Sequence, residues 1–218
     1  MTPVRLDDAA LRRARRHLAA ADPVMARLVR EIGPVPMQAH RGGSAFAYLS
    51  RAILAQQISV AAARSIAQRT SDRFGWPWRP EQMLQASDAE LRALGLSRQK
   101  VGYLRDLAAH TRNGLPLGRL SLLSDERVIE ELTVVKGIGR WTAEMYLMFR
   151  LGRGDVLPVD DLGIRSAMRR AYAMRGLPKQ GRMRRIAERW RPYRSIACFY
   201  LWQSLDAAKG PPPRRKGR

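Results

Sequence analysis

The sequence predicts an all-α protein, and the arrangement of its apolar and helix-starting residues carries that prediction. Segments with apolar residues at helical spacing follow one another at short intervals along nearly the whole chain. Serine, aspartate or proline stands before many of these segments, where a helix would begin. Runs in which polar and apolar residues alternate, as in half-buried strands, are missing from the sequence. We therefore expect helices joined by short loops.

Helix starts in the first half of the chain are marked by residues suited to that position. A serine or aspartate oxygen accepts a hydrogen bond from a first-turn amide, and proline fits the first helical position because its backbone angle is already helical. The signals are a helix over Asp7–Leu18, a start at Asp22-Pro23, an apolar stripe from Phe46 to Leu54, a helix capped by Ser59 through Phe74, a start at Pro80, and a capping box from Ser87 to Glu90.

The second half continues in the same way and ends in a basic tail. The expected helices cover Ser97–Arg112, Asp125–Leu132 with Ser124 as its cap, Met183–Trp190, and a last helix from Pro192 through Ala208. The segment 209–218 is rich in proline and arginine, so we expect it to be disordered. Residues 1–208 are the expected folded domain.

The charge balance points to a polyanionic partner. The 218 residues include 40 Lys+Arg and 19 Asp+Glu, which gives a formal net charge of +21. Such an excess repels itself, and nucleic acid binding is its commonest reason. A generally arginine-rich proteome is the alternative explanation.

The sequence argues against a disulfide, a metal site, a secretion signal and a membrane segment. A single cysteine, Cys198, excludes an internal disulfide and a four-cysteine metal site. The histidines, His17, His40 and His110, lie far apart and form no metal-binding motif. We expect no cofactor. Neither an apolar signal core nor a long apolar run is present, so we expect an intracellular protein without a membrane segment.

The stretch 134–170 organises the chain. It contains a turn with two glycines, Lys136-Gly137-Ile138-Gly139, and a carboxylate pair, Asp160-Asp161, that opens a later helix. Glycine permits positive φ and close approach of the backbone to a ligand, and the amides at the start of a helix favour an anion. A phosphate is the expected occupant of this turn. Trp141, Met145 and Met148 follow at helical spacing and are expected to share a face.

Two interpretations compete for the glycine turn. With Thr142 in the third position and an acidic residue about twenty positions further on, the stretch imitates a dinucleotide-binding turn. That fold needs repeated strand–helix units, which the sequence does not predict. The other interpretation is a helix-hairpin-helix, in which two helices and a short glycine turn hold a DNA phosphate.

The order of several motifs resembles the 3-methyladenine DNA glycosylase II family, within the helix-hairpin-helix base-excision glycosylases. The resemblance runs from about Phe46 to Trp202, and the family's prototype has an additional N-terminal β-rich domain, so this chain resembles a compact form. The motifs that carry the resemblance are residues 52–60 (AILAQQISV), 94–96 (LGL), 136–143 (KGIGRWTA), Asp160-Asp161 and 189–195 (RWRPYRS).

The resemblance implies two packed helical subdomains with a central cleft, the hairpin and the catalytic aspartate both lying within 124–175. A nucleotide would be flipped out of duplex DNA into the cleft, because the bond to the base is otherwise out of reach. Asp161 matches the catalytic carboxylate, which would stabilise an oxocarbenium-like transition state and orient water. Asp160 is the expected helix cap, although capping is an ordinary role for either aspartate.

The resemblance also implies a base pocket and a monofunctional enzyme. Trp141 and Trp202 match aromatic pocket positions, where their faces would hold a cationic base. Met145 stands where the prototype has an aromatic residue, so the pocket should be less aromatic. Relatives that also cut the DNA backbone have a lysine at the position of Trp141, which forms a Schiff base with the sugar. For each tryptophan, simple core packing is the alternative.

The expected DNA contacts centre on the hairpin. Gln57 falls where the prototype inserts an apolar wedge into the stack, and it would plug the gap left by the flipped base; loop capping is its alternative role. The expected DNA-binding residues are Gln56, Gln57, Lys136, Gly137, Gly139 and Arg140, and a candidate monovalent cation site comprises the carbonyls of Thr133, Val135 and Ile138.

The sequence therefore predicts a monomeric, monofunctional DNA glycosylase that removes alkylated purines from damaged duplex DNA. Two alternatives remain. A non-catalytic helix-hairpin-helix DNA-binding module would need the glycines and the charge but not Asp161 or the pocket tryptophans. A glycosylase for oxidised or deaminated bases would share the scaffold and differ in the pocket.

Overall fold

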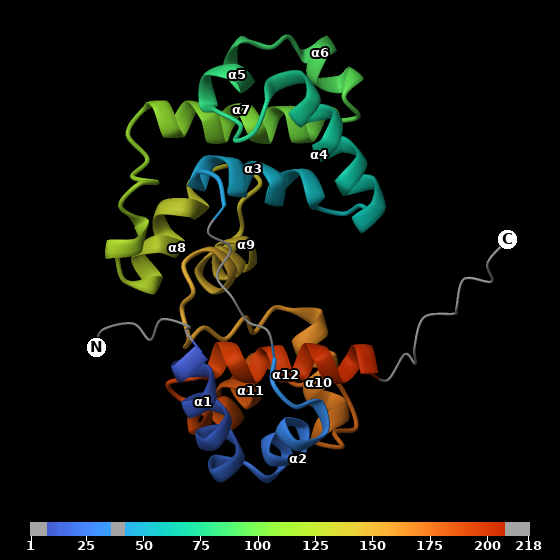
Figure 1. The fold of residues 1–218 in the computed structure, drawn as a ribbon, viewed down its shortest axis with the longest axis vertical. Helices are drawn as coiled ribbons and strands as arrows, with labels where there is room; N and C mark the ends of the chain where they lie inside the picture. Colours follow the sequence, from blue (N-terminus) through green and yellow to red (C-terminus); the bar gives the residue numbers. More distant parts are fainter. Residues whose placement is uncertain (1–7, 36–41, 208–218) are drawn as a thin grey trace, which may run out of the picture. The chain divides into compact units, whose positions relative to one another are not determined.

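A computed structural model describes residues 8–35 and 42–207 of the chain (Figure 1). Every regular element in these ranges is a helix, which confirms the predicted all-α class. No helix among these residues has both the length and the apolar character needed to cross a membrane. The residues form two compact units, unit 1 from residues 1–39 and 151–218 and unit 2 from residues 40–150. The predicted disordered tail, 209–218, and His40 lie outside the described residues.

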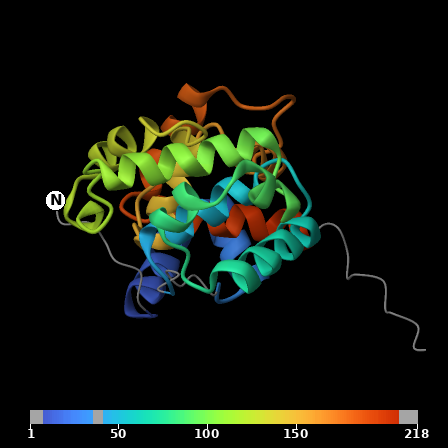
Figure 2. The same cartoon turned by 90° about the horizontal axis from the view of Figure 1, so that it is seen from above.

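Unit 2 is organised around α7, the long helix that crosses the view in Figure 2. Its buried face, from Val101 to Ala108, is covered by α3, α5 and α6, while α8 packs on α9. The helices of unit 2 are α3 (Ala45–Ala55), α4 (Val60–Phe74), α5 (Pro80–Gln85), α6 (Asp88–Ala93), α7 (Arg98–Arg112), α8 (Asp125–Thr133) and α9 (Arg140–Met145), with a 3-10 turn at Leu120–Leu122.

Unit 1 is built on α12, which packs against α1, α2 and α10. Residues of α12 such as Ile196, Cys198 and Leu201 are fully buried, and the thiol of Cys198 is part of this core. Figure 1 shows α1 and α2 in blue beside the orange and red C-terminal helices. The helices of unit 1 are α1 (Asp8–Ala21), α2 (Pro23–Ile32), α10 (Leu162–Ala171), α11 (Gln180–Ala187) and α12 (Arg194–Ala207), with a 3-10 turn at Glu188–Trp190.

Several predicted helix starts are confirmed by their side-chain caps, whereas the helix predicted over Met183–Trp190 begins earlier, at Gln180, and its last three residues form a 3-10 turn. Ser59 accepts a hydrogen bond from the Ala62 amide at 3.2 Å, and Asp22 accepts one from the Val24 amide at 2.9 Å. The serines before α6, α7 and α8 form the same contact with the amide three residues later. These bonds are local in sequence, which is why residue type alone located them.

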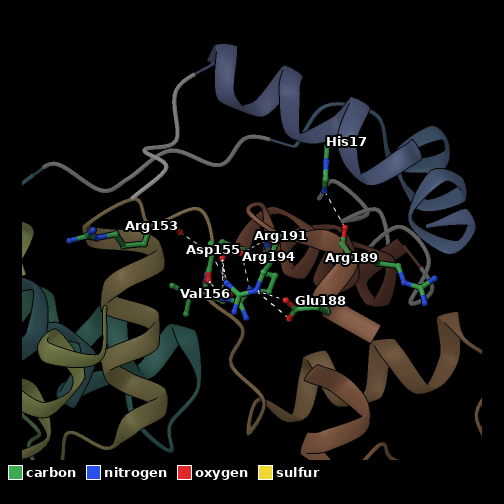
Figure 3. Close-up of polar contacts among 9 residues, drawn as sticks. His17, Arg153, Asp155, Val156, Glu188, Arg189, Arg191 and Arg194 are labelled. Atoms are coloured by element: carbon green, nitrogen blue, oxygen red, sulfur yellow. Dashed lines mark hydrogen bonds and ion pairs between the residues drawn. The ribbon is translucent and has the colours of Figure 1, made fainter. Parts of the chain in front are cut away.

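The last helix starts later than predicted, at Arg194 rather than Pro192. Asp155 lies at its N-terminus and accepts hydrogen bonds from the Arg194 backbone amide at 3.3 Å and from the Arg194 Nε at 2.8 Å (Figure 3). A carboxylate from a distant loop thus takes the place of a local cap. The boundary depends on a contact across 39 positions, which helix-start signals in the sequence do not reveal.

The expectation that Trp141, Met145 and Met148 share a helix face is wrong. The α-helix ends at Met145 and continues as a π-helical turn, Tyr146–Arg150, so the 3.6-residue spacing is not kept. Trp141 is 43% exposed, Met145 is half-buried, and Met148 is 1% exposed. Met148 therefore belongs to the core of unit 2, where it is not available to a ligand.

Candidate functional site

The first part of the site is the turn between α8 and α9 in unit 2. Gly137 has φ of +86°, a left-handed conformation that favours glycine. A Cβ added at Gly137 would overlap the ring of Tyr103 on α7. The turn thus needs glycine here for two reasons, its backbone conformation and its close approach to an aromatic ring.

Two side chains from elsewhere in unit 2 hold this turn in place. Gln56 donates from its Nε2 to the Gly137 carbonyl at 2.8 Å, and Asp106 accepts from the Lys136 amide at 2.8 Å. The predicted DNA-binding residue Gln56 is therefore seen here as a brace of the turn. Asp106 and Tyr103 were missed by sequence reasoning, because both are helix residues about thirty positions away and carry no local motif.

Gly139 stands at the N-cap of α9 with open space beside it. Its backbone is extended, with φ of −87° and ψ of 172°, and a Cβ there would meet nothing within 4 Å. Glycine offers no side-chain oxygen to cap the helix, so the first-turn amides of α9 receive no cap bond from this residue. The turn borders a hollow of about 420 Å³ that is also lined by Gln56, Gln57, Lys100 and Tyr103.

The cationic side chains near the turn differ in the partners that they contact. Arg140 forms ion pairs with Glu126 at 2.6 Å and Glu144 at 3.2 Å, and the hydrogen bond to Glu126 raises the pKa of Arg140. Lys136 is exposed. Lys100, which sequence reasoning missed, donates from Nζ to the Leu54 carbonyl at 2.7 Å, and burial lowers the pKa of its ammonium group. The turn therefore combines one paired arginine with two lysines.

The loop before α4 carries Gln57 in an unusual backbone conformation. Gln57 has φ of +57°, which is uncommon for a residue other than glycine, and its side chain is exposed. The next residues include the exposed apolar side chains of Ile58, 37% exposed, and Val60, 78% exposed. Such backbone strain concentrates at functional sites, so the loop fits a role in contacting a partner.

The second part of the site is Asp161 in unit 1. Asp161 is the N-cap of α10 and its Oδ1 accepts the Ile164 amide at 2.7 Å. The same Oδ1 accepts the indole Nε1–H of Trp202, on α12, at 3.0 Å. The carboxylate is 8% exposed. These two donors to Oδ1 help to fix the orientation of the carboxylate.

The prediction that Asp160 caps the helix is wrong, because Asp161 does so. Asp160 is exposed and its Oδ1 accepts a hydrogen bond from Gln180 Nε2 at 2.6 Å, at the start of α11. Adjacent residues point in different directions, so only one of the pair can reach the α10 amides. The capping residue is thus the same residue that the resemblance assigns to catalysis.

Gly163 closes the space beside Asp161. A Cβ added to it would lie 3.0 Å from Asp161 Oδ1 and 3.1 Å from Trp202 Cδ1 and Nε1. A larger residue would therefore push the indole and the carboxylate apart. This position was missed by sequence reasoning, because an ordinary helical glycine gives no signal of a neighbour 39 residues away.

We expect Gly163→Ala to lower the base-excision activity that the resemblance implies, while leaving the protein folded. Alanine is favoured over glycine in a helix by about 1 kcal/mol, which offsets part of the crowding. The added methyl group would disturb the Trp202–Asp161 hydrogen bond, so we expect the single-turnover rate to fall about tenfold, the effect of about 1.4 kcal/mol on a barrier. Single-turnover kinetics with a thermal unfolding curve checks this, and Gly102→Ala, at a glycine of α7 with open space beside it, is the control.

The predicted pocket residues are divided between the units. Trp202 lies in unit 1 with Asp161, whereas Trp141 and Met145 belong to unit 2. Trp202 is half-buried and its ring packs edge-on against Phe199 at 5.8 Å between centroids. Within the described ranges, no cluster of three or more histidine, cysteine, aspartate or glutamate side chains could hold a metal ion.

The fold and these two features define a class of protein. An all-α chain with a glycine turn between α8 and α9 and a buried carboxylate at a helix start is of the helix-hairpin-helix kind. The family model of the HhH-GPD superfamily of base excision DNA repair proteins matches residues 50–192, well over half of the chain. The chain belongs to this superfamily, which confirms the resemblance read from its motifs.

Relatives and solved structures extend the match to nearly the whole chain. DNA-3-methyladenine glycosylase 1 of Schizosaccharomyces pombe is 35% identical over 211 residues, 94% of this chain and 92% of that protein. The solved structure of that yeast's 3-methyladenine DNA glycosylase in complex with abasic DNA gives a TM-score of 0.79 at 33% identity, covering 92% of this chain and 100% of that one. A DNA-3-methyladenine glycosidase of Bacillus halodurans gives a TM-score of 0.79 at 32% identity, over 96% of this chain and 94% of that one.

Proposed function

We propose that this protein is a monofunctional DNA glycosylase that removes alkylated purines from duplex DNA. The observation that carries the proposal is Asp161, a carboxylate that is 8% exposed and held by the α10 N-terminus and by Trp202. A protein that only binds DNA would need this group only as the cap of α10. The names of relatives that match over nine-tenths of the chain support the same class of activity.

The proposed reaction breaks the bond between the sugar C1′ and the base nitrogen. The bonding electron pair leaves with the base, which neutralises the positive charge of an alkylated purine. The sugar then carries an oxocarbenium-like charge, and the fixed negative charge of Asp161 stabilises it. Water adds to C1′ and loses one proton, for which Asp161 is the candidate acceptor.

The hairpin is the proposed DNA anchor. The amides after Gly137 and Gly139 would hold a backbone phosphate, with Lys136 nearby and Gln57 filling the space left by the flipped base. A monovalent cation bound to the carbonyls of Thr133, Val135 and Ile138 would add positive charge to the turn. We further propose that the protein acts inside the cell and as a monomer.

Turnover should end at an abasic site. A lyase step needs an amine that forms a Schiff base with the sugar, and Trp141 offers none. Incubation with alkylated DNA and borohydride should therefore trap no covalent enzyme–DNA adduct. A known lysine-dependent glycosylase-lyase is the positive control, and a trapped adduct would show that another lysine, such as Lys100, acts as the nucleophile.

The direct test is base release from methylated DNA, with the products separated and identified by chromatography. We expect methylated purines to be released by the wild-type protein. Release of oxidised or deaminated bases instead, from matched substrates, would move the activity to another member of the superfamily. Tight DNA binding without release of any base would leave only a DNA-binding module.

A further inference from the structure

Unit 1 contains a second basic hollow that the reaction described above does not use. It lies between the α10–α11 connection and α11, and its volume is about 970 Å³. Four cationic residues line it, and no carboxylate does: Arg175, Lys179, Arg182 and Arg185. All four are exposed. The hollow is therefore open, and all the charged side chains that line it are positive.

These cations differ from other arginines of the same unit. Arg191 and Arg194 are paired with Asp155 at 2.8 Å, as Figure 3 shows. Within residues 8–35 and 42–207, by contrast, none of the four cations of the hollow forms an ion pair. Clustered like charges repel one another, so an arrangement of this kind is stabilised by an external anion.

The backbone that carries the cations is braced on both sides. Pro178 is buried and its carbonyl accepts a hydrogen bond from Arg165 Nε at 3.4 Å. Gln180 donates to Asp160 at 2.6 Å, and this ties the start of α11 to the residue beside Asp161. The cations therefore project from a fixed framework, next in sequence to the elements that position the catalytic carboxylate.

The start of α11 adds positive potential to the same place. Lys179 is the N-cap residue and makes no side-chain cap bond, since a lysine side chain has no acceptor atom. The first-turn amides and the helix dipole thus add to the charge of the lysine rather than being offset by a carboxylate. Three of the cations, Lys179, Arg182 and Arg185, recur at intervals of three residues and form a stripe.

The stripe has the dimensions of a row of phosphates. Six residues of helix rise roughly 9 Å. Each strand of duplex DNA carries one phosphate per about 3.4 Å of axis, so roughly three phosphates fall within that length. An isolated anion would need fewer cations and no extended row.

We propose that Arg175, Lys179, Arg182 and Arg185 bind backbone phosphates of duplex DNA, as a second anchoring surface in addition to the α8–α9 hairpin. The proposal rests on DNA being the partner, as proposed above. Hairpin contacts alone, all made by unit 2, would leave unit 1, which carries Asp161, without phosphate contacts of its own. Phosphate contacts by unit 1 fix the register of the duplex on that unit without reading its sequence.

The test compares two variants that lose the same charge. In the first, the four cations of the hollow are changed to glutamine. In the control, four exposed arginines of α1 and α2, Arg12, Arg13, Arg16 and Arg30, are changed to glutamine. Affinity for an undamaged duplex oligonucleotide is measured by fluorescence anisotropy over a range of KCl concentrations.

We expect the hollow variant to lower the slope of log Kd against log salt by roughly two to four, since each lost phosphate contact removes about 0.9. The control should change the slope by less than about one on the same scale. Equal changes in the two variants, or no change in the first, would overturn the proposal. Loss of binding to polyglutamate with an unchanged DNA slope would overturn it as well, in favour of an acidic polypeptide.

Two further measurements keep the outcome clear. If the quadruple variant unfolds, the pairs Arg175/Lys179 and Arg182/Arg185 are measured separately, and each pair should lower the slope by roughly one to two. Base release by the wild-type protein is followed in parallel. If the wild-type protein releases no base but the hollow variant shows a lower slope of log Kd against log salt, the proposed reaction is refuted and the second anchor is supported. If the wild-type protein releases base but the slope of the hollow variant is unchanged, only the second anchor is refuted.

Discussion

Asp161→Asn is expected to slow single-turnover excision by about two to three powers of ten, the usual contribution of a preorganised electrostatic group. Asparagine keeps the size of the side chain and an oxygen that can accept the Ile164 amide and the Trp202 indole. Asparagine is also as good a helix cap as aspartate, so the unfolding curve should barely change. Only the negative charge is removed. DNA affinity should stay equal or rise slightly, because a negative charge near phosphates has been lost.

Asp160→Asn is the matched control for this prediction. Its side chain accepts a hydrogen bond from Gln180 rather than capping α10, and an asparagine oxygen can accept the same bond. We therefore expect little loss of activity and little loss of stability. The assay uses one lesion-containing duplex under single-turnover conditions. Excision that survives Asp161→Asn but fails in Asp160→Asn would mean that the wrong carboxylate has been assigned, and full activity in both variants would sink the mechanism.

Gly139→Asp is expected to fold normally and to lose at least about tenfold in DNA affinity, the effect of about 1.4 kcal/mol. A Cβ at this position meets nothing within 4 Å, and φ of −87° suits any residue. Aspartate is a favourable N-cap, so the variant should be at least as stable as the wild type. Its charge, however, would occupy the position in front of α9 where a phosphate is proposed to bind. Anisotropy titrations at several salt concentrations measure the loss.

Gly139→Asn separates charge from size in this experiment. Asparagine fills the same space and caps the helix in the same way, but carries no charge. Its affinity should lie close to that of the wild-type protein, with a loss well below that of Gly139→Asp. Equal losses in the two variants would indicate steric blocking of the turn, and unchanged affinity in both would exclude a phosphate contact there.

The sequence by itself determined the helical class, most helix starts and the position of the hairpin. The caps of Ser59 and Asp22 were predicted correctly because each bonds an amide two or three residues away. Gly137 was identified as a turn residue, and its φ of +86° agrees with this. The superfamily could also be recognised, since its motifs follow in one order along the chain. These features depend on interactions between near neighbours in sequence, which residue type alone reveals.

Two assignments failed although the features that decide them are local: Asp161 caps α10 through the Ile164 amide, and a π-helical turn follows Met145 directly. Asp161 points toward the α10 amides, whereas the Asp160 side chain points to Gln180, and residue type does not distinguish the two directions. Met148 was misplaced because a π-helical turn interrupts the helix after Met145. A pattern of spacings cannot show such a change of period.

Only the tertiary structure decided what surrounds the glycines and the proposed catalytic carboxylate, Asp161. Gln56 reaches Gly137 across 81 positions, and Trp202 reaches Asp161 across 41. The ring of Tyr103 excludes any side chain at Gly137, while the position beside Gly139 is open. None of these contacts leaves a periodic or local signal in the sequence. They arise when helices pack, because packing brings together side chains whose separation along the chain has no fixed relation to their distance in space.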